Sequence, residues 1–397
     1  MPGLRLPLTL LFVLTTAHAQ WEILPTASTA DLRGIDNVGQ GIAWASGTAG
    51  TVLHTTDDGK TWQRCATPPD ADHLDFRGIQ AFDASTAIVM SSGKGPLSRL
   101  YKTIDACHTW TLLFTNPDPE GFWDAIQFST TSFGKRDQPE GVLIGDPVEG
   151  VFSVFVSKDS GNTWRRWGKP DRKGYCRELD ANASKGEALF AASNQALLEF
   201  FDTNFVAVTG GPSGARLLYS SGYSEGQGGL RMGSCWTAFS YVDLPLNHTG
   251  ASSGAFAVAP KDGNTYFPMK LMIVGGDYTK PDTSEGNSVF VSTREGTRLP
   301  YNLSIQVVAA QTPPHGYRSA VAYDAATKTW ITVGPNGTDI STDDGRNFRP
   351  LKPDASDSPD ADQHWNALSL PFVVGPHGRI GKLRPDALKP EPSGAKP

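Results

Sequence analysis

Five copies of a short sequence pattern place polar side chains, three of them arginines, at one shared position. The pattern is apolar, polar, small, aliphatic, as in "LRGI" from residue 32 and "FRGI" from residue 76. The residues at its second position are Arg33, Arg77, Asp124, Arg318 and Asn366. Because a guanidinium group binds a carboxylate or a phosphate through paired hydrogen bonds, converging arginines would form an anion site.

A second set of polar residues follows glycine-rich turns. Seven such turns come after short apolar runs, among them "VMSSGKG" from Val89 and "VGPHG" from Val374. The insertion "GGDYTKPDTSEG" at 275–286 is the longest of them, and long loops on a rigid scaffold often carry function. The polar residues of these turns are Asp146, Asp277, Tyr278, Lys280 and His377. We expect them to lie beside the arginines.

These charges could instead pair with one another inside the protein. Asp31 lies two residues before Arg33, and Asp75 lies two residues before Arg77. Each pair therefore shares one face of a strand, because side chains alternate along a strand. Asp124 comes from the next copy of the pattern. Two alternatives stay open: the arginines bind a ligand, or they form a ring of internal ion pairs.

The elements that position these residues are hairpins whose turns repeat the frame S/T-x-D-x-G-x-T-W. "TTDDGKTW" at 55–62 shows the full frame. The short Thr55 and Asp57 side chains can bond to backbone groups and Gly59 can adopt positive φ, so the frame closes a tight turn. Trp62 then starts the returning strand. The aspartates of the four copies, which we interpret as structural, are Asp57, Asp105, Asp159 and Asp343.

This frame resembles the Asp-box repeat, also called the bacterial neuraminidase repeat, of sialidase-like β-propellers and of the photosystem II assembly and stability factors. Three copies match well, and "TIDACHTW" at 103–110 matches except for the glycine. The resemblance implies an all-β propeller of four-stranded blades, in which the Asp-box turn joins the third strand to the fourth. The inner strands and the glycine-rich turns then meet on the opposite face, where we expect the site.

The glycine-rich turns give the number of blades. Their seven copies predict a seven-bladed β-propeller, within the usual range of about four to eight blades. The last blade lacks a fourth strand before the chain becomes proline-rich, whereas "WEILPT" at 21–26 has the pattern of one. We therefore expect this N-terminal strand to pair with the strand at 378–383, which closes the ring and removes its open sheet edges.

The two ends of the chain are predicted to lie outside the propeller, which spans residues 20–383. Arg5, the apolar run after it and the small residues "AHA" predict a cleaved signal peptide over 1–19 and a secreted or periplasmic protein. The proline-rich residues 384–397 are predicted to be a disordered tail. No later segment has the ~18 consecutive apolar residues of a membrane span, so we expect a soluble protein. We also expect it to be a monomer.

Charge and composition exclude several kinds of partner. The chain has 35 Lys and Arg against 41 Asp and Glu with no basic cluster, which argues against nucleic acid and anionic membranes. The 42 Gly and 29 Pro between short apolar runs are typical of an all-β protein with many turns. The eight His show no metal-ligand spacing, so the sequence predicts no metal site and no cofactor.

Four cysteines fit a compartment that permits disulfides. Cys107 replaces the glycine of the second Asp-box turn, and Cys65 lies three residues after the first box tryptophan. If consecutive hairpins stand side by side, these thiols lie at similar heights, and we predict that they form a disulfide. Cys176 and Cys235 are left unassigned, because their positions relative to the box tryptophans indicate opposite faces of the disc.

The resemblance to sialidases raises a glycoside hydrolase as one alternative, because sialidases also carry an arginine cluster on this face. They need a tyrosine nucleophile, a glutamate that activates it and an acidic aspartate. The candidates for these roles are Tyr278 or Tyr317, Glu187 and Asp124, none of which matches by motif. The family's Phe-Arg-Ile-Pro signature is replaced by "FRGI" from residue 76, which lacks the proline.

This chain resembles the photosystem II assembly factors more closely than it resembles the sialidases. Their propellers carry an arginine patch, are exported, and bind a partner protein without catalysing a reaction. This resemblance implies an exported binding or assembly module, which we favour over the enzyme. Its arginine-lined channel mouth would capture an acidic group of a protein, a peptide or an acidic glycan.

Overall fold

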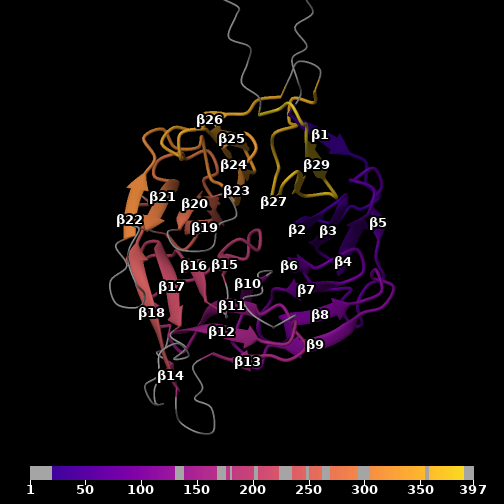
Figure 1. Ribbon diagram of the computed structural model, residues 1–397, viewed down its shortest axis with the longest axis vertical. Helices are drawn as coiled ribbons and strands as arrows, with labels where there is room; N and C mark the ends of the chain where they lie inside the picture. The colour runs from indigo at the N-terminus through magenta and orange to yellow at the C-terminus, as the bar shows by residue number, and fades with distance from the viewer. Residues whose placement is uncertain are drawn as a thin grey trace, which may run out of the picture.

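Seven sheets stand around a central axis and form a seven-bladed β-propeller (Figure 1). Each of the seven glycine-rich turns follows the second strand of a blade, so the predicted number of blades is confirmed. The computed structural model describes residues 20–129, 138–167, 176–178, 181–200, 204–222, 235–246, 250–261, 269–293, 305–353 and 357–388. The predicted signal peptide therefore lies outside the described residues.

Blades 1 to 3 each contain four antiparallel strands, which follow one another in chain order from the axis outward. Blade 1 contains β2 (Leu32–Gly39), β3 (Ile42–Gly47), β4 (Thr51–Thr55) and β5 (Gln63–Arg64). Blade 2 contains β6 (Phe76–Ala81), β7 (Ala87–Ser91), β8 (Arg99–Thr103) and β9 (Thr111–Thr115), with the short 3₁₀ helix η1 (Gly95–Leu97) after β7. Blade 3 contains β10 (Trp123–Phe128), β11 (Gly141–Val148), β12 (Val151–Ser157) and β13 (Arg165–Arg166).

Blades 4 to 6 continue the ring. Blade 4 contains β15 (Leu197–Glu199), β16 (Phe205–Val208), β17 (Arg216–Gly222), β18 (Cys235–Asp243) and a fifth strand, β14 (Cys176–Glu178). Blade 5 contains β19 (Ser253–Pro260), β20 (Lys270–Asp277), β21 (Ser288–Thr293) and β22 (Ile305–Ala309). Blade 6 contains β23 (Ala320–Asp324), β24 (Thr329–Gly334), β25 (Gly337–Ser341) and β26 (Arg349–Pro350).

The two ends of the described chain complete blade 7. It contains β27 (Ala367–Ser369), β28 (Phe372–Val374), β29 (Ile380–Leu383) and, outermost, β1 (Trp21–Leu24). Trp21 is paired with Leu383 and Leu24 with Ile380, which confirms the predicted closure. Trp21 is also 1% exposed and donates its indole N–H to Thr338 Oγ1 of blade 6 at 3.0 Å. The closing strand β1 therefore completes blade 7 and also bonds to blade 6.

Blade 4 departs from the expected four strands. The strand β14 precedes β15 in the chain but lies beside β18 at the outer edge, parallel to it. Cys176 of β14 is the register partner of Cys235 of β18. The expectation that these two cysteines lie on opposite faces of the disc is therefore wrong, because the chain adds a strand next to β18.

The hydrophobic core lies mainly between neighbouring blades. One cluster joins Leu32 and Leu53 of blade 1 to Phe372 and Ile380 of blade 7. Five tryptophans are almost completely buried, namely Trp21, Trp44, Trp123, Trp330 and Trp365. Truncation of a buried aromatic side chain to Ala typically costs about 3–5 kcal/mol, so these contacts hold the ring together.

Four turns share one hydrogen-bond pattern, and we call them the aspartate turns. They are residues 55–61, 103–109, 157–163 and 341–347, each between the third and fourth strands of its blade. In the first, Thr55 Oγ1 donates to Asp57 Oδ1 (2.8 Å) and accepts from the Gly59 N–H (3.1 Å). Thr61 donates its N–H and its hydroxyl to the two Asp57 oxygens. The carboxylate therefore holds the turn, as predicted, and Asp105, Asp159 and Asp343 do the same.

The predicted disulfide joins the first two blades. Cys65 and Cys107 are bonded, with their Cα atoms 5.3 Å apart. Cys107 takes the place that glycine has in the other aspartate turns, with φ of 61° against 82° at Gly59. Its N–H still donates to Thr103 Oγ1 at 3.0 Å, so the turn closes without glycine.

The first residues of the predicted disordered tail are part of the fold. Arg384 donates its N–H to the Gln20 carbonyl, and its guanidinium lies 3.5 Å from a carboxylate oxygen of Asp357. Leu388 packs against the core cluster of blades 6 and 7. The tail prediction is therefore wrong for 384–388, and residues 389–397 lie outside the described chain.

Candidate functional site

A segment that the sequence analysis missed crosses the centre of the ring. Residues 191–195, which we call the axial segment, precede β15 and contact other blades. Asn194 accepts the Ile126 N–H of blade 3 at 2.8 Å, and Ser193 donates to the Ser319 carbonyl next to blade 6 at 2.6 Å. Gln195 donates to the Leu368 carbonyl of blade 7 at 3.1 Å. The segment therefore links blades 3, 6 and 7 across the centre of the ring.

Gly78, a small residue of the inner-strand pattern, leaves space for the axial segment. A Cβ atom on Gly78 would lie 2.8 Å from Asn194 Oδ1, closer than real Cβ contacts allow. The sequence signal for the axial segment was the run "SNQ" at 193–195. It places three polar residues next to an inner strand. Polar side chains at a crowded axis indicate hydrogen bonding across it.

Arg33 and Arg77 each have an aspartate partner two residues earlier in the chain. Arg77 Nε donates to Asp75 Oδ2 at 2.8 Å, whereas Arg33 Nη2 lies 3.9 Å from Asp31 Oδ2. Both arginine side chains remain 29% exposed. The internal pairs proposed as one alternative therefore exist in these two blades, and Arg77 Nη1 also donates to the Ala191 carbonyl at 3.1 Å. Part of each arginine side chain nevertheless remains exposed.

Tyr317 lies between these arginines and a group of aromatic rings. Burial raises the pKa of its phenol, and the nearby guanidinium charges of Arg33 and Arg77 oppose the rise. Its ring packs edge-on against Phe256 with centroids 4.7 Å apart. Phe256 in turn stacks on Phe190 at 4.0 Å.

Tyr278, from the long turn of blade 5, completes this aromatic group. It is 52% exposed and contacts Phe190 and Phe256 edge-on, with ring centroids 6.5 and 6.2 Å away. We call Phe190, Phe256, Tyr278 and Tyr317 the aromatic wall. It stands beside the two arginines, so a ligand that carries both an anionic group and an apolar group would find complementary contacts there.

Two acidic side chains, Asp124 and Asp146, lie close to each other, and Asp124 lies near Arg77. Asp124 is 1% exposed, and its Oδ2 atom has no hydrogen-bond partner in the described part of the chain. Burial and the charge of Asp146 raise the pKa of Asp124, whereas Arg77 opposes the rise. Burial also raises the pKa of Asp146 to about 6, although its carboxylate accepts the Leu189 N–H at 3.0 Å. The two carboxyl groups therefore hold a proton more readily than isolated aspartates.

Arg318 differs from Arg33 and Arg77. Its side chain is completely buried and forms an ion pair with Asp339 on β25, through Nε at 2.9 Å and through Nη2. Its Nη1 donates to the Tyr317 carbonyl at 2.7 Å and to Asn336 Oδ1 at 2.6 Å. The expectation of three converging arginines is therefore reduced to two, because this guanidinium is used inside blade 6.

The other predicted residues have mixed surroundings. Asn366 donates to the Leu32 carbonyl at 2.8 Å and so ties blade 7 to blade 1. Burial acts to raise the pKa of Asp277, but hydrogen bonds from Thr279 and Ser252 lower this pKa to about 2. Lys280 is largely exposed, 3.8 Å from Asp277, and His377 is exposed, with its N–H donating to Asp31.

The glutamate proposed for a sialidase-like mechanism has partners of its own. Glu187 is 4% exposed and accepts from Arg216 Nε at 2.8 Å and from Thr209 Oγ1 at 2.5 Å. It also accepts the Ser184 N–H at 2.7 Å. These hydrogen bonds join Glu187 to residues in and next to blade 4. Glu187 therefore stabilises that blade and is not paired with Tyr278 or Tyr317.

Two kinds of feature are absent from the described residues. They contain no helix that is both long and apolar enough to cross a membrane. Across the same ranges, no three His, Cys, Asp or Glu side chains gather in a way that could hold a metal ion.

The chain forms a seven-bladed β-propeller, in which two partly exposed arginine side chains lie near Tyr317 of the aromatic wall. No protein-family model matches the chain, and no curated protein matches it. The likeness is to solved structures. YCF48 from Cyanidioschyzon merolae is 17% identical with a TM-score of 0.58, and the match covers 93% of this chain and 100% of that one.

Two further structures show the same likeness. YCF48 bound to D1 peptide is 14% identical with a TM-score of 0.55, over 92% of this chain and 97% of that one. The extracellular domain of the two-component system BT4673 from B. thetaiotaomicron is 11% identical with a TM-score of 0.53, over 92% of this chain and 40% of that one. At these identities the likeness establishes the propeller fold.

Proposed function

We propose that this protein is an exported binding or assembly module, in which Arg33 and Arg77 capture an acidic group of a protein or peptide partner. The observation that carries the proposal is that the Arg33 and Arg77 side chains are each 29% exposed, while each pairs with an aspartate two residues earlier in the chain. An anionic ligand can add hydrogen bonds to such groups without leaving a buried charge unpaired.

The surroundings of the arginines support a protein or peptide ligand. The exposed Tyr278, which packs against the buried Phe256, offers apolar contact near the cationic groups, as in interfaces where Tyr and Arg supply most of the binding energy. A structural neighbour, YCF48, has been solved with a D1 peptide bound. The predicted signal peptide supports export. The four aspartate turns support the further proposal that they are Asp-box repeats.

A peptide-binding experiment tests the proposal. The mature protein would be titrated by fluorescence anisotropy with a labelled hexapeptide library that has free C-terminal carboxylates and with its amidated, Glu-free counterpart. Arg33→Gln and Arg77→Gln should each weaken binding of the acidic library by about tenfold, which is the usual size of a charge-assisted hydrogen bond. Arg64→Gln on the exposed outer strand β5 removes the same charge and is the matched control.

Two results would overturn the proposal. One is equal binding of the acidic and the amidated libraries, with no effect of either arginine variant. The other is release of the aryl group from an aryl sialoside by the mature protein, with loss of that turnover in Tyr317→Phe. The second result would establish the sialidase-like alternative.

A further inference from the structure

The outer strands of the propeller differ in how they end their sheets. In blades 1, 3 and 6 the outer strand is two residues long and reads QR, RR or RP. Short edges with charges or proline discourage pairing with another chain. In blades 2 and 5 the outer strand has five residues and no charge, TLLFT in β9 and IQVVA in β22, and Leu112 and Val308 are 47% and 42% exposed. Within the described residues, β22 pairs only with β21, so its other edge is open.

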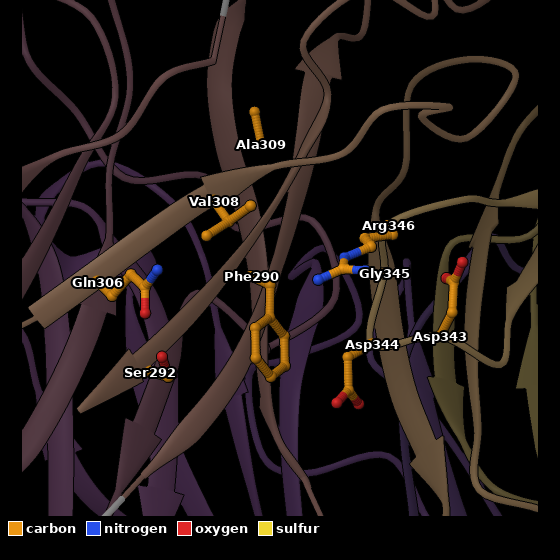
Figure 2. Close-up of a pocket in the computed structure, with 9 residues that line it drawn as sticks. All are labelled: Phe290, Ser292, Gln306, Val308, Ala309, Asp343, Asp344, Gly345 and Arg346. Atoms are coloured by element: carbon orange, nitrogen blue, oxygen red, sulfur yellow. The ribbon is translucent and has the colours of Figure 1, made fainter. Parts of the chain in front are cut away.

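A cavity of about 440 Å³ lies beside this edge (Figure 2). Val308 is the cross-strand partner of Phe290, and Gln306 is the partner of Ser292, so these four side chains share one face of blade 5. The aspartate turn of blade 6, residues 343–346, forms the opposite wall. The Arg346 carbonyl accepts the Gln311 N–H at 2.8 Å, which joins the two walls just beyond β22.

One cationic side chain, Arg346, lines the cavity together with the carboxylates of Asp343 and Asp344. Asp343 is occupied by its own turn, where it accepts from Ser341 and Asn347. Asp344 is paired with Lys261, with Nζ and Oδ1 2.5 Å apart. The Arg346 side chain has no hydrogen-bond or ion-pair partner in the described parts of the chain. Figure 2 shows its guanidinium directed toward the Phe290 ring.

We propose that the edge of β22 receives an extended, acidic segment of a partner protein. The segment adds a strand to blade 5 through backbone hydrogen bonds. Because side chains alternate along a strand, the residue opposite Val308 continues the row of Phe290 and Val308, and an apolar side chain there enters the cavity. An acidic residue nearby pairs with Arg346. This site is independent of Arg33 and Arg77.

Hydrogen exchange with a defined peptide tests this inference. The probe is a blocked eight-residue peptide of alternating Val and Thr with one Phe and one Glu at its centre. Its addition should slow amide exchange within residues 305–309 of the full mature protein. Val308→Lys should abolish the protection and lower the affinity at least tenfold, because it places a charge on the edge and in the cavity.

The charge contact is tested separately. Arg346→Gln should lower the affinity up to about fivefold, the range of a partly exposed ion pair, and replacing the peptide's Glu with Gln should have the same effect on the wild-type protein but none on Arg346→Gln. The matched control is Leu112→Lys on β9, the outer strand of blade 2, where Leu112 is 47% exposed. This control should bind like the wild type. Circular dichroism would verify that each variant is folded.

Three results would overturn the inference. Protection of 305–309 before the peptide is added would mean that another part of the chain occupies the edge. A dimer that Val308→Lys dissociates, measured by sedimentation, would mean that the occupant is a second copy. Peptide binding that neither Val308→Lys nor Arg346→Gln changes would place the contact elsewhere. None of these results bears on Arg33 and Arg77.

Discussion

Arg77 and Arg318 have the same place in their blades, but their ion pairs differ. The pair of Arg318 with Asp339 is sealed, with side-chain exposures of 0% and 1%. The pair of Arg77 with Asp75 is open, with exposures of 29% and 25%. A sealed pair uses its hydrogen bonds inside the protein, whereas an open pair can also bind a ligand. The place of a residue in a repeat therefore does not determine its role.

The third strand of each blade explains the difference. Two residues before the aspartate turn, blade 6 has Asp339, whereas blades 1, 2 and 3 have Leu53, Tyr101 and Phe155. The buried carboxylate draws the Arg318 guanidinium into blade 6. Blades 1 and 2 offer only an apolar or aromatic side chain at this place, so their arginines pair with Asp31 and Asp75 and stay partly exposed.

The largest expected effect is on stability. Arg318→Met leaves the buried Asp339 without its main partner and should lower the free energy of unfolding by about 3–5 kcal/mol. The matched Arg77→Met should cost about 1 kcal/mol or less, because its pair is partly solvated. Urea denaturation of both variants measures the difference. Equal costs would remove the distinction between sealed and open pairs.

The acidic pair near Arg77 should make stability depend on pH. Because burial raises the pKa of Asp146 to about 6, the folded protein binds a proton more tightly than the unfolded chain, and this contribution to stability is lost as pH rises from about 4 to about 6. Asp146→Asn should therefore be more stable than the wild type at pH 7.5, by on the order of 2 kcal/mol, and equally stable near pH 4. Thermal unfolding at both pH values measures this. A variant that is less stable at pH 7.5 would contradict the expectation.

His315, beside the sealed pair, should give a smaller effect of the same direction. A hydrogen bond with Asp339 raises its pKa, while burial and Arg318 oppose the rise. The stabilisation is therefore complete below the unfolded pKa of about 6.5 and is lost as pH rises through the folded value. His315→Gln should lower the melting temperature at pH 5.5 more than at pH 9. An equal decrease at both values would mean that the proton on His315 contributes nothing.

The sequence was sufficient for the fold because turns carry strong local signals. Seven glycine-rich turns gave the blade number, the apolar "WEIL" gave the closing strand, and Cys107 in a glycine position gave the disulfide. The fifth strand of blade 4 was missed because β14 is three residues long and pairs with a strand far along the chain. Such pairing leaves no local pattern.

The site was predicted less well because it depends on contacts between blades. Arg33, Arg77, Asp124 and Asp146 were identified from their places in the repeats. The sequence-based prediction missed the axial segment. It also missed Phe190 and Phe256, because they look like ordinary core residues in the sequence. The burial of Arg318 had a sequence signal, because Asp339 replaces an apolar residue on the third strand. Its meaning depends on knowing which strands are neighbours.

The central claim is that the open arginines bind an acidic ligand and the sealed arginine does not. The most direct test is a ¹⁵N–¹H spectrum of the arginine Nε–H groups during titration with the free-carboxylate hexapeptide library. The signals of Arg33 and Arg77 should shift with the acidic library and not with its amidated counterpart, while the Arg318 signal stays in place. Unchanged Arg33 and Arg77 signals, or a shift confined to Arg318, would contradict the account.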